Sequence, residues 1–249
     1  MFLTTTCCLA LFSIFNFNFF FSNPNNFPKK VAPASKYTLV LAGDSMTQAL
    51  GAGETILPIL RSKHPNKEIH ILNYGIGSTS ILTLPNRLTK GAIRGNETLP
   101  PILNQNFDVI LIESFGNNPL SEYSLSDGLK KQEESLDQVI KLIREAKPKA
   151  VIIFVATIAP NRERYAENIV NLTTELREKW ADERISYIKN HIKYAKDHKI
   201  PLIDLFDKSL DKAQDYINDS DFIHPSNNGL VFIGEGIANY LVKKRVLPF

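Results

Sequence analysis

The sequence predicts an α/β fold, a three-layer α/β/α sandwich with a five-stranded parallel sheet. From Tyr37 onward, short apolar runs alternate with longer amphipathic stretches. The apolar runs are rich in Val, Leu and Ile, as in strands buried on both faces of a parallel sheet. The chain has 249 residues, 43% hydrophobic and 22% charged, which excludes a disordered or collagen-like protein.

Five apolar runs are the candidate strands. The first, residues 37–42, stops at Gly43. The others are residues 69–73, 109–112, 151–155 and 202–206. Ligand sites in such sheets form beyond the carboxyl ends of the strands. We therefore expect the loops that follow the first four strands to share one rim.

Three amphipathic stretches are the candidate helices. Residues 126–146 place apolar side chains on one side and end before Pro148. Residues 162–198 carry apolar residues at steps of mostly three or four, as one long helix or as two with a break near Asp182. Residues 227–242 form the last helix.

The start of the chain has a different composition. The first 28 residues contain no Asp, Glu, Lys or Arg, and they hold both cysteines and eight of the 15 phenylalanines. We predict an N-terminal hydrophobic segment at residues 1–22, a Pro- and Asn-rich linker at 23–36 and the domain at 37–249. The domain has no cysteine, which excludes a disulfide framework, a Cys-ligated zinc site and a cysteine nucleophile there.

The hydrophobic segment has three interpretations. Roughly 20 residues are just long enough to cross a bilayer, so it fits a membrane anchor. A cleaved signal peptide needs small residues at the cleavage site; residues 20–22 are a poor site, and Ala32-Pro33-Ala34 comes late. A buried helix is disfavoured because no polar face recurs at helical spacing.

Two features of the sequence give opposite indications of the side of the membrane on which the domain lies. Lysines at 29, 30 and 36 favour keeping the following chain cytoplasmic, whereas an export signal favours the outside. We expect a membrane-associated protein on the extracytoplasmic side, or a secreted one if the leader is cleaved. A net charge of +3 gives no reason to expect a nucleic-acid partner, and a monomer is the default expectation.

A candidate nucleophile follows the first strand, where residues 43–47 read Gly-Asp-Ser-Met-Thr. Gly43 allows a sharp exit from the strand, and Ser45 falls near the start of a helix. Backbone N–H groups at that position can stabilise an oxyanion. The alternative is that Asp44, Ser45 or Thr47 only caps the helix.

A candidate base and its partner precede the last helix. A serine needs a base, usually His, that is oriented by a carboxylate. Asp221 and His224 are three residues apart and can project from one loop, although a solvated surface loop is the alternative. The other histidines lie in polar or helical settings, with His191 and His198 expected on a helix surface. No pair has a metal-binding spacing such as H-E-x-x-H.

Two glycine- and asparagine-containing stretches follow the second and third strands. Residues 73–78 read Asn-Tyr-Gly-Ile-Gly-Ser, which lets the Gly77 N–H face a ligand but falls short of a dinucleotide-binding fingerprint. Residues 113–119 read Glu-Ser-Phe-Gly-Asn-Asn-Pro, and a side-chain amide there can donate to an oxyanion. Each stretch taken alone also fits a simple turn.

In chain order, these four motifs resemble those of the SGNH (GDSL-type) hydrolase family, over about residues 37–245. The resemblance implies a flavodoxin-like α/β/α fold and a serine esterase that uses neither a metal nor an organic cofactor. It implies Ser45 as nucleophile, His224 as general base and Asp221 as the group that orients His224. The oxyanion hole would be the N–H groups of Ser45 and Gly77 and the amide of Asn118.

The resemblance leaves some points open. Asn117 is a second candidate for the amide, but Gly116-x-Asn118 keeps the family's Gly-x-Asn spacing. Pro119 stands where many members have Asp, and Met46-Thr47 replaces a common Ser-Leu. Neither change removes a catalytic group.

The substrate is less defined than the chemistry. We expect a small-molecule, glycan or lipid ester, cleaved through an acyl-enzyme on Ser45. The alternatives are an O-acyltransferase that uses the same triad and a non-catalytic glycan-binding module on the same fold. Arg162 and Arg164, after the fourth strand, either meet an anionic substrate or are solvated charges that start a helix.

Overall fold

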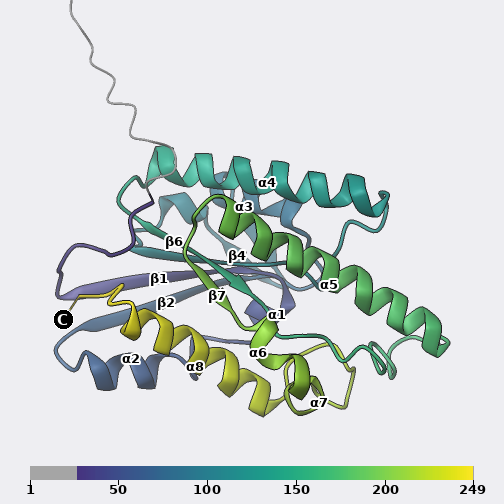
Figure 1. The fold of residues 1–249 in the computed structure, drawn as a ribbon. Helices are drawn as coiled ribbons and strands as arrows, with labels where there is room; N and C mark the ends of the chain where they lie inside the picture. The colour runs from purple at the N-terminus through teal and green to yellow at the C-terminus, as the bar shows by residue number, and fades with distance from the viewer. Residues whose placement is uncertain (1–26, 249) are drawn as a thin grey trace, which may run out of the picture.

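The computed structural model describes residues 27–248 and confirms the predicted three-layer α/β/α sandwich (Figure 1). Five parallel strands form the central sheet in the order β2-β1-β5-β6-β7. The strands are β1 (Lys36–Gly43), β2 (Glu68–Gly75), β5 (Val109–Glu113), β6 (Val151–Ala156) and β7 (Leu202–Asp204). Each predicted strand is present, within a few residues of its expected bounds.

Helices cover both faces of the sheet. The helices α3 (Leu84–Thr89), α4 (Leu125–Ala146) and α5 (Thr174–Asp197) lie on one face, and α2 (Leu57–Lys63) and α8 (Asn227–Lys243) lie on the other (Figure 1). Alternate strand residues point to opposite faces. Val40 and Ile110 therefore belong to the core beneath α3 and α4, whereas Leu39 and Leu111 belong to the core beneath α2 and α8.

The long amphipathic stretch forms a helix over only part of its predicted length. α5 begins at Thr174, where the Thr173 hydroxyl accepts a hydrogen bond from the Leu176 N–H at 3.4 Å, and the helix runs without a break through Asp182. Residues 162–173 are mostly turns. Arg177 holds them against the helix by donating to the carbonyl oxygen of Tyr165 at 3.0 Å.

The last predicted strand is also shorter than expected. β7 ends at Asp204, and Phe206 starts the short helix α6 (Phe206–Ser209). The Asp204 carboxylate accepts a hydrogen bond from the Asp207 N–H at 3.1 Å and so turns the chain out of the sheet. The apolar Leu205 and Phe206 are buried, but in the helical layers rather than in the sheet.

Several short elements carry too little periodicity to be predicted. They are α1 (Ser45–Gln48), α7 (Ala213–Tyr216), the 3₁₀ helices Ile81–Thr83, Ile102–Asn104 and Leu210–Lys212, and the hairpin β3 (Ala92–Arg94) and β4 (Glu97–Leu99).

The surface position expected for His191 is wrong. His191 belongs to α5, and its ring is buried and stacks on Phe154 of β6 at a centroid distance of 4.3 Å. Burial lowers the pKa of His191 to about 3.

Residues 27–36 fall within the predicted linker, yet they pack on the domain. Phe27 is buried and stacks below the guanidinium of Arg144 at 5.0 Å. Val31 is buried as well, and its N–H donates to the carbonyl oxygen of Val246 at 3.0 Å. The hydrophobic segment at 1–22 lies outside the described residues. Among residues 27–248, no helix is both long and apolar enough to cross a bilayer.

Candidate active site

Ser45 stands at the first position of α1, directly after β1. Asp44 is fully buried and caps the helix, with its Oδ1 accepting from the Met46 N–H at 2.8 Å. Gly43 is required there, because a Cβ atom would lie 2.0 Å from Thr47 Oγ1. The first N–H groups of a helix have no acceptor within the helix, so the Ser45 N–H is available to a ligand.

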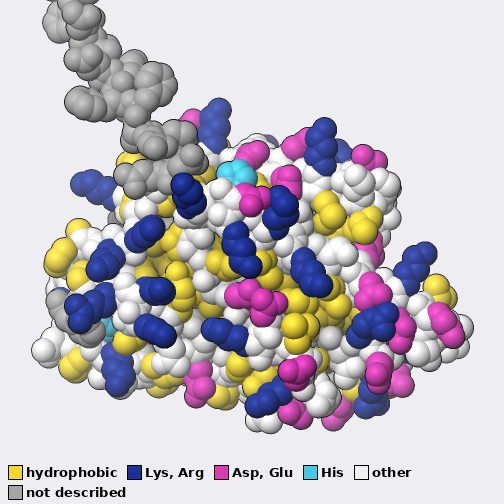
Figure 2. All heavy atoms as spheres, in the orientation of Figure 1, with side chains coloured by type: hydrophobic (Ala, Val, Ile, Leu, Met, Phe, Trp, Pro, Cys, Tyr) yellow, Lys and Arg dark blue, Asp and Glu magenta, His cyan; other side chains and the backbone are white. Residues whose placement is uncertain are grey.

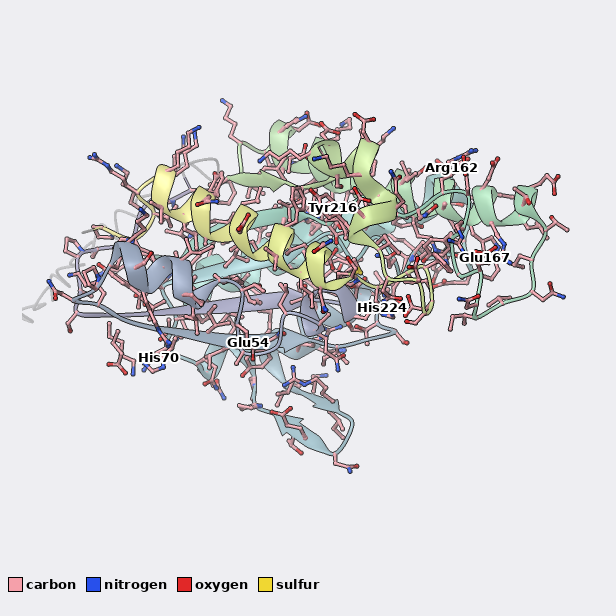
Figure 3. The ribbon with its side chains drawn as sticks, turned by 90° about the horizontal axis from the view of Figure 1, so that it is seen from below. Glu54, His70, Arg162, Glu167, Tyr216 and His224 are labelled. Carbon is pink, nitrogen blue, oxygen red and sulfur yellow. The ribbon has the colours of Figure 1, made fainter. Side chains whose placement is uncertain are left out.

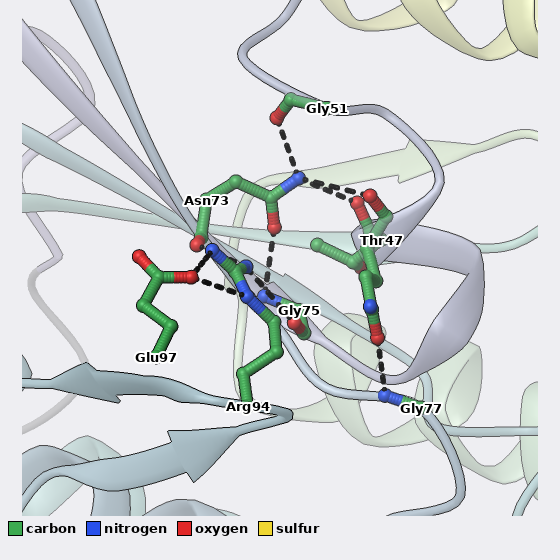
Figure 4. Close-up of polar contacts among 8 residues, drawn as sticks. Thr47, Gly51, Asn73, Gly75, Gly77, Arg94 and Glu97 are labelled. Atoms are coloured by element: carbon green, nitrogen blue, oxygen red, sulfur yellow. Dashed lines mark hydrogen bonds and ion pairs between the residues drawn. The ribbon is translucent and has the colours of Figure 1, made fainter.

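Asn73 joins the end of β2 to α1 (Figure 4). Its amide nitrogen donates to the carbonyl oxygens of Thr47 and Gly51, each at 2.8 Å, and its Oδ1 accepts from the Gly75 N–H at 2.7 Å. A Cβ atom on Gly75 would lie 2.2 Å from the Gln48 backbone nitrogen, so the close approach requires glycine. These contacts bring Gly77 next to α1. Asn73 is part of the sequence motif at residues 73–78, but the motif alone does not predict that its side chain links β2 to α1.

His224 and Asp221 come together in the loop that leads into α8, and Figure 3 labels His224 in that loop. His224 Nδ1 and Asp221 Oδ2 are 2.7 Å apart, which leaves Nε2 as the free ring nitrogen. Asp221 Oδ1 accepts from the backbone N–H groups of Ile223 at 2.8 Å and His224 at 2.9 Å. Burial alone would raise the pKa of Asp221, but the hydrogen bonds from His224 and Ile223 outweigh it and hold that pKa below its ordinary value.

The two remaining predicted donors already have acceptors in the free protein. The Gly77 N–H donates to Gln48 Oε1 at 2.7 Å (Figure 4). Asn118 Nδ2 donates to Asp44 Oδ2 at 2.9 Å. An amide nitrogen carries two hydrogens, so Asn118 keeps one for a ligand. The Gln48 oxygen therefore occupies the acceptor position of the Gly77 N–H.

One cleft of about 640 Å³ brings the predicted residues together. Ser45, Gly77, Asn118 and His224 line it, and Asp221 stands behind His224. Within residues 27–248, no hydrogen bond links Ser45 to His224. Such bonds are often long in free enzymes and shorten when a substrate binds.

Arg162 and Arg164 are the two arginines that the sequence singled out as possible contacts of an anionic substrate. Arg162 forms ion pairs with Asp182 at 2.7 Å and Glu178 at 3.1 Å, and Arg164 pairs with Glu167 at 2.5 Å. Neither arginine is among the residues that line the cleft. These contacts favour the interpretation as solvated charges, but the expectation that they start a helix is wrong, because α5 begins only at Thr174.

Arg184, from α5, lines the cleft instead. Its Nε donates to the Tyr165 hydroxyl at 3.0 Å, and that hydroxyl donates to Asn117 Oδ1 at 3.2 Å. Asn117 is thereby tied to the cleft wall rather than to Asp44. Burial raises the pKa of Tyr165, which keeps the phenol neutral. No sequence motif marked Arg184, because only the packing of α5 brings it to this wall.

Two carboxyl groups and one guanidinium are buried behind the serine turn. Glu113 Oε2 lies 3.4 Å from the Asp44 N–H, and its Oε1 accepts from the Ser114 hydroxyl at 2.7 Å. Burial and the neighbouring Asp44 raise the pKa of Glu113 well above its ordinary value, and burial also raises the pKa of Asp44. Arg87 donates to the Gly43 carbonyl at 2.8 Å, and burial lowers its pKa to about 10.

Comparisons with known proteins identify the family and agree with the fold. The profile of the GDSL-like Lipase/Acylhydrolase family matches residues 41–230. Among solved structures, a lipase/acylhydrolase from Enterococcus faecalis superposes with a TM-score of 0.60 at 19% identity, covering 86% of this chain and 98% of that one. The acetyl xylan esterase AlAXEase gives a TM-score of 0.59 at 19% identity, with 82% and 99% covered.

A third solved structure, a possible lipase from Chitinophaga pinensis, gives a TM-score of 0.54 at 15% identity and covers 84% of this chain and 99% of that one. No curated protein matches the sequence significantly. At these identities the solved structures support the fold alone, and the family profile spans most of the chain. The chain therefore belongs to the GDSL-like lipase/acylhydrolase family, and it is a hydrolase that acts on ester bonds.

Proposed function

We propose that the protein is a serine esterase that cleaves carboxylic esters through an acyl-enzyme on Ser45. The observation that supports this most directly is the convergence of Ser45, Gly77, Asn118 and His224 on one cleft. The Asp221 carboxylate on His224 Nδ1 holds the tautomer whose Nε2 can accept a proton.

The proposed reaction has two halves. His224 Nε2 takes the Ser45 hydroxyl proton while Oγ attacks the ester carbonyl, and the imidazolium then protonates the leaving alcohol. Water repeats the sequence on the acyl-enzyme and releases the acid. In both halves, the oxyanion is held by the N–H groups of Ser45 and Gly77 and the free N–H of Asn118, once the substrate oxygen has displaced Gln48 Oε1 from Gly77.

We propose an acyl or acetyl ester of a carbohydrate or lipid as the substrate. The structural neighbours include proteins described as a lipase/acylhydrolase and as an acetyl xylan esterase. The uncharged residues 1–22 support a membrane-associated, extracytoplasmic location, where envelope glycans and lipids carry such esters.

Ester turnover by the purified chain tests the proposal. p-Nitrophenyl acetate and p-nitrophenyl octanoate are the short and long acyl donors, with Ser45→Ala as the test variant. Ser78→Ala is the control, because Ser78 lines the same cleft and has no proposed role. We expect Ser45→Ala to lose at least ~10³-fold in kcat/KM and Ser78→Ala to lose less than threefold.

Equal rates for Ser45→Ala and the unchanged chain on both donors would reject Ser45 as the nucleophile. Adding an alcohol acceptor separates the two enzyme alternatives. A hydrolase releases the free acid as its main product, whereas a transferase forms the new ester in competition with water.

A further inference from the structure

Charge is unevenly distributed over this nearly neutral chain. The net charge is +3, yet exposed lysines gather at the end of the domain where the strands begin. We call this end the basic face and define it by Lys29, Lys30, Lys149, Lys199, Lys243 and Lys244, all of which are exposed. Figure 2 shows Lys and Arg side chains crowded over the half of the molecule that holds the C-terminus and the start of β1.

The topology explains why these lysines meet. All strands of a parallel sheet begin at one edge, and α4, α5 and α8 run back to that edge and end there. Lysines near a helix C-terminus interact favourably with the helix dipole, which accounts for a cation such as Lys243. That effect does not account for Lys29 and Lys30, which belong to no helix.

At this end of the domain Lys36 pairs with Glu68 at 3.6 Å, but the six lysines of the basic face have no such partner among the described residues. Exposed acidic residues gather instead toward the opposite end, near the rim that carries the cleft. Examples are Glu163, Asp207, Asp211, Asp215 and Asp219, none of which forms an ion pair within the described residues. The domain therefore has a basic end and an acidic end that bears the active-site cleft.

The chain enters the domain at the basic face. Phe27 is packed under Arg144 at the end of α4, and Val31 is hydrogen-bonded to Val246 after α8. Five residue steps separate Phe27 from the end of the apolar segment at residue 22. An extended chain covers at most roughly 18 Å in five steps, so the basic face is tethered close to that segment.

We propose that the basic face docks on the anionic lipid headgroups of the bilayer that holds residues 1–22. Clusters of Lys beside a membrane segment attract anionic lipids, and the attraction falls off within a Debye length of about 10 Å. The acidic rim is repelled by the same surface, so the cleft faces the aqueous phase. Esters carried by glycans or soluble molecules then reach Ser45 more readily than lipids of the same leaflet. This inference rests on the proposed membrane association and not on the esterase chemistry.

Lysine footprinting on the full-length chain tests the docking. The chain is placed in nanodiscs of phosphatidylcholine alone or with about one-third phosphatidylglycerol, and acetylation rates are read by mass spectrometry. We expect Lys29, Lys30, Lys243 and Lys244 to react at least threefold more slowly in the anionic discs. The protection should vanish at about 0.5 M salt, where the Debye length is roughly 4 Å.

A pair of matched variants separates docking from general protection. The basic-face variant carries Gln at Lys29, Lys30, Lys243 and Lys244. The control variant carries Gln at four exposed lysines outside the basic face, Lys130, Lys179, Lys189 and Lys212. Protection of Lys149 and Lys199 should be lost in the first variant and kept in the second. Both should hydrolyse p-nitrophenyl acetate at the rate of the unchanged chain, so failure of docking and failure of the esterase proposal are distinguishable.

Equal lysine reactivity in the two lipids, or protection that also covers the control lysines, would overturn the inference. If the chain does not enter nanodiscs, co-sedimentation with vesicles of the same two compositions replaces the footprint. Binding must then require phosphatidylglycerol and fall roughly fivefold for each basic-face lysine removed. Binding that does not depend on phosphatidylglycerol, or that does not change when basic-face lysines are removed, would also overturn the inference.

Discussion

The side-chain amide of Asn118 donates to the fully buried carboxylate of Asp44 at 2.9 Å, across the ends of β5 and β1. The same carboxyl group caps α1 through Met46. One buried side chain therefore holds both the helix that begins with Ser45 and the amide proposed to bind the oxyanion. Asp44 thereby fixes the Ser45 N–H and the Asn118 amide relative to each other.

Replacing Asn118 with Ala should lower kcat on p-nitrophenyl acetate by about 10²- to 10³-fold, the usual cost of one oxyanion-hole donor. The matched control is Asn117→Ala, which loses only the contact with Tyr165. We expect it to cost less than tenfold. The reverse order of the two effects would assign the amide to Asn117. Thermal unfolding of both variants shows whether loss of the Asp44 contact has also destabilised the fold.

Asp221→Asn should lower kcat by about 10³- to 10⁴-fold with little change in KM, because Asn no longer favours the tautomer with a free Nε2. The exposed neighbour Asp219→Asn is the control and should change kcat less than twofold. Steady-state kinetics near neutral pH check both. A loss of less than tenfold in Asp221→Asn would mean that another group orients His224.

Gln48 offers a test of the oxyanion position, because its Oε1 already accepts the hydrogen bond of the Gly77 N–H. Gln48→Ala removes this competitor and should raise affinity for a boronic acid that forms a tetrahedral adduct with Ser45, by about threefold. Gln48→Glu puts a negative charge beside the oxyanion and should lower kcat at least tenfold. Calorimetric titration and kinetics report the two effects. Unchanged values in both variants would place the oxyanion away from Gly77.

Glu113→Gln should change how stability depends on pH. The carboxyl group is buried beside Asp44, so its folded pKa lies well above the ordinary 4.5. Between these two pKa values the unfolded chain has lost the proton and the folded chain still holds it, so stability falls as pH rises through this window. The variant lacks this proton and should show a flatter profile above pH 4.5. Urea unfolding at several pH values from 5 to 8 measures the slope, and parallel profiles for the two chains would contradict the prediction.

The local sequence predicted the five strands of the sheet and their order along the chain, and it singled out the candidate site residues. Strands such as 151–155 are buried on both faces, so their composition alone marks them, and the long helices repeat their apolar residues over several turns. Short elements gave no such signal. Residues 162–173 continue the apolar pattern of α5, yet the contact between Arg177 and the Tyr165 carbonyl holds them as turns.

The sequence by itself determined that Ser45, Gly77, Asn118 and His224 follow strands or precede a helix at one end of a parallel sheet, because parallel strands end on one edge. Only the tertiary structure decided what those residues contact. Asn118 meets Asp44 from a position 74 residues away, Gln48 covers the Gly77 N–H, and Arg184 reaches the cleft through the packing of α5. Such contacts depend on side-chain directions set by long-range packing, which no local pattern of residues records.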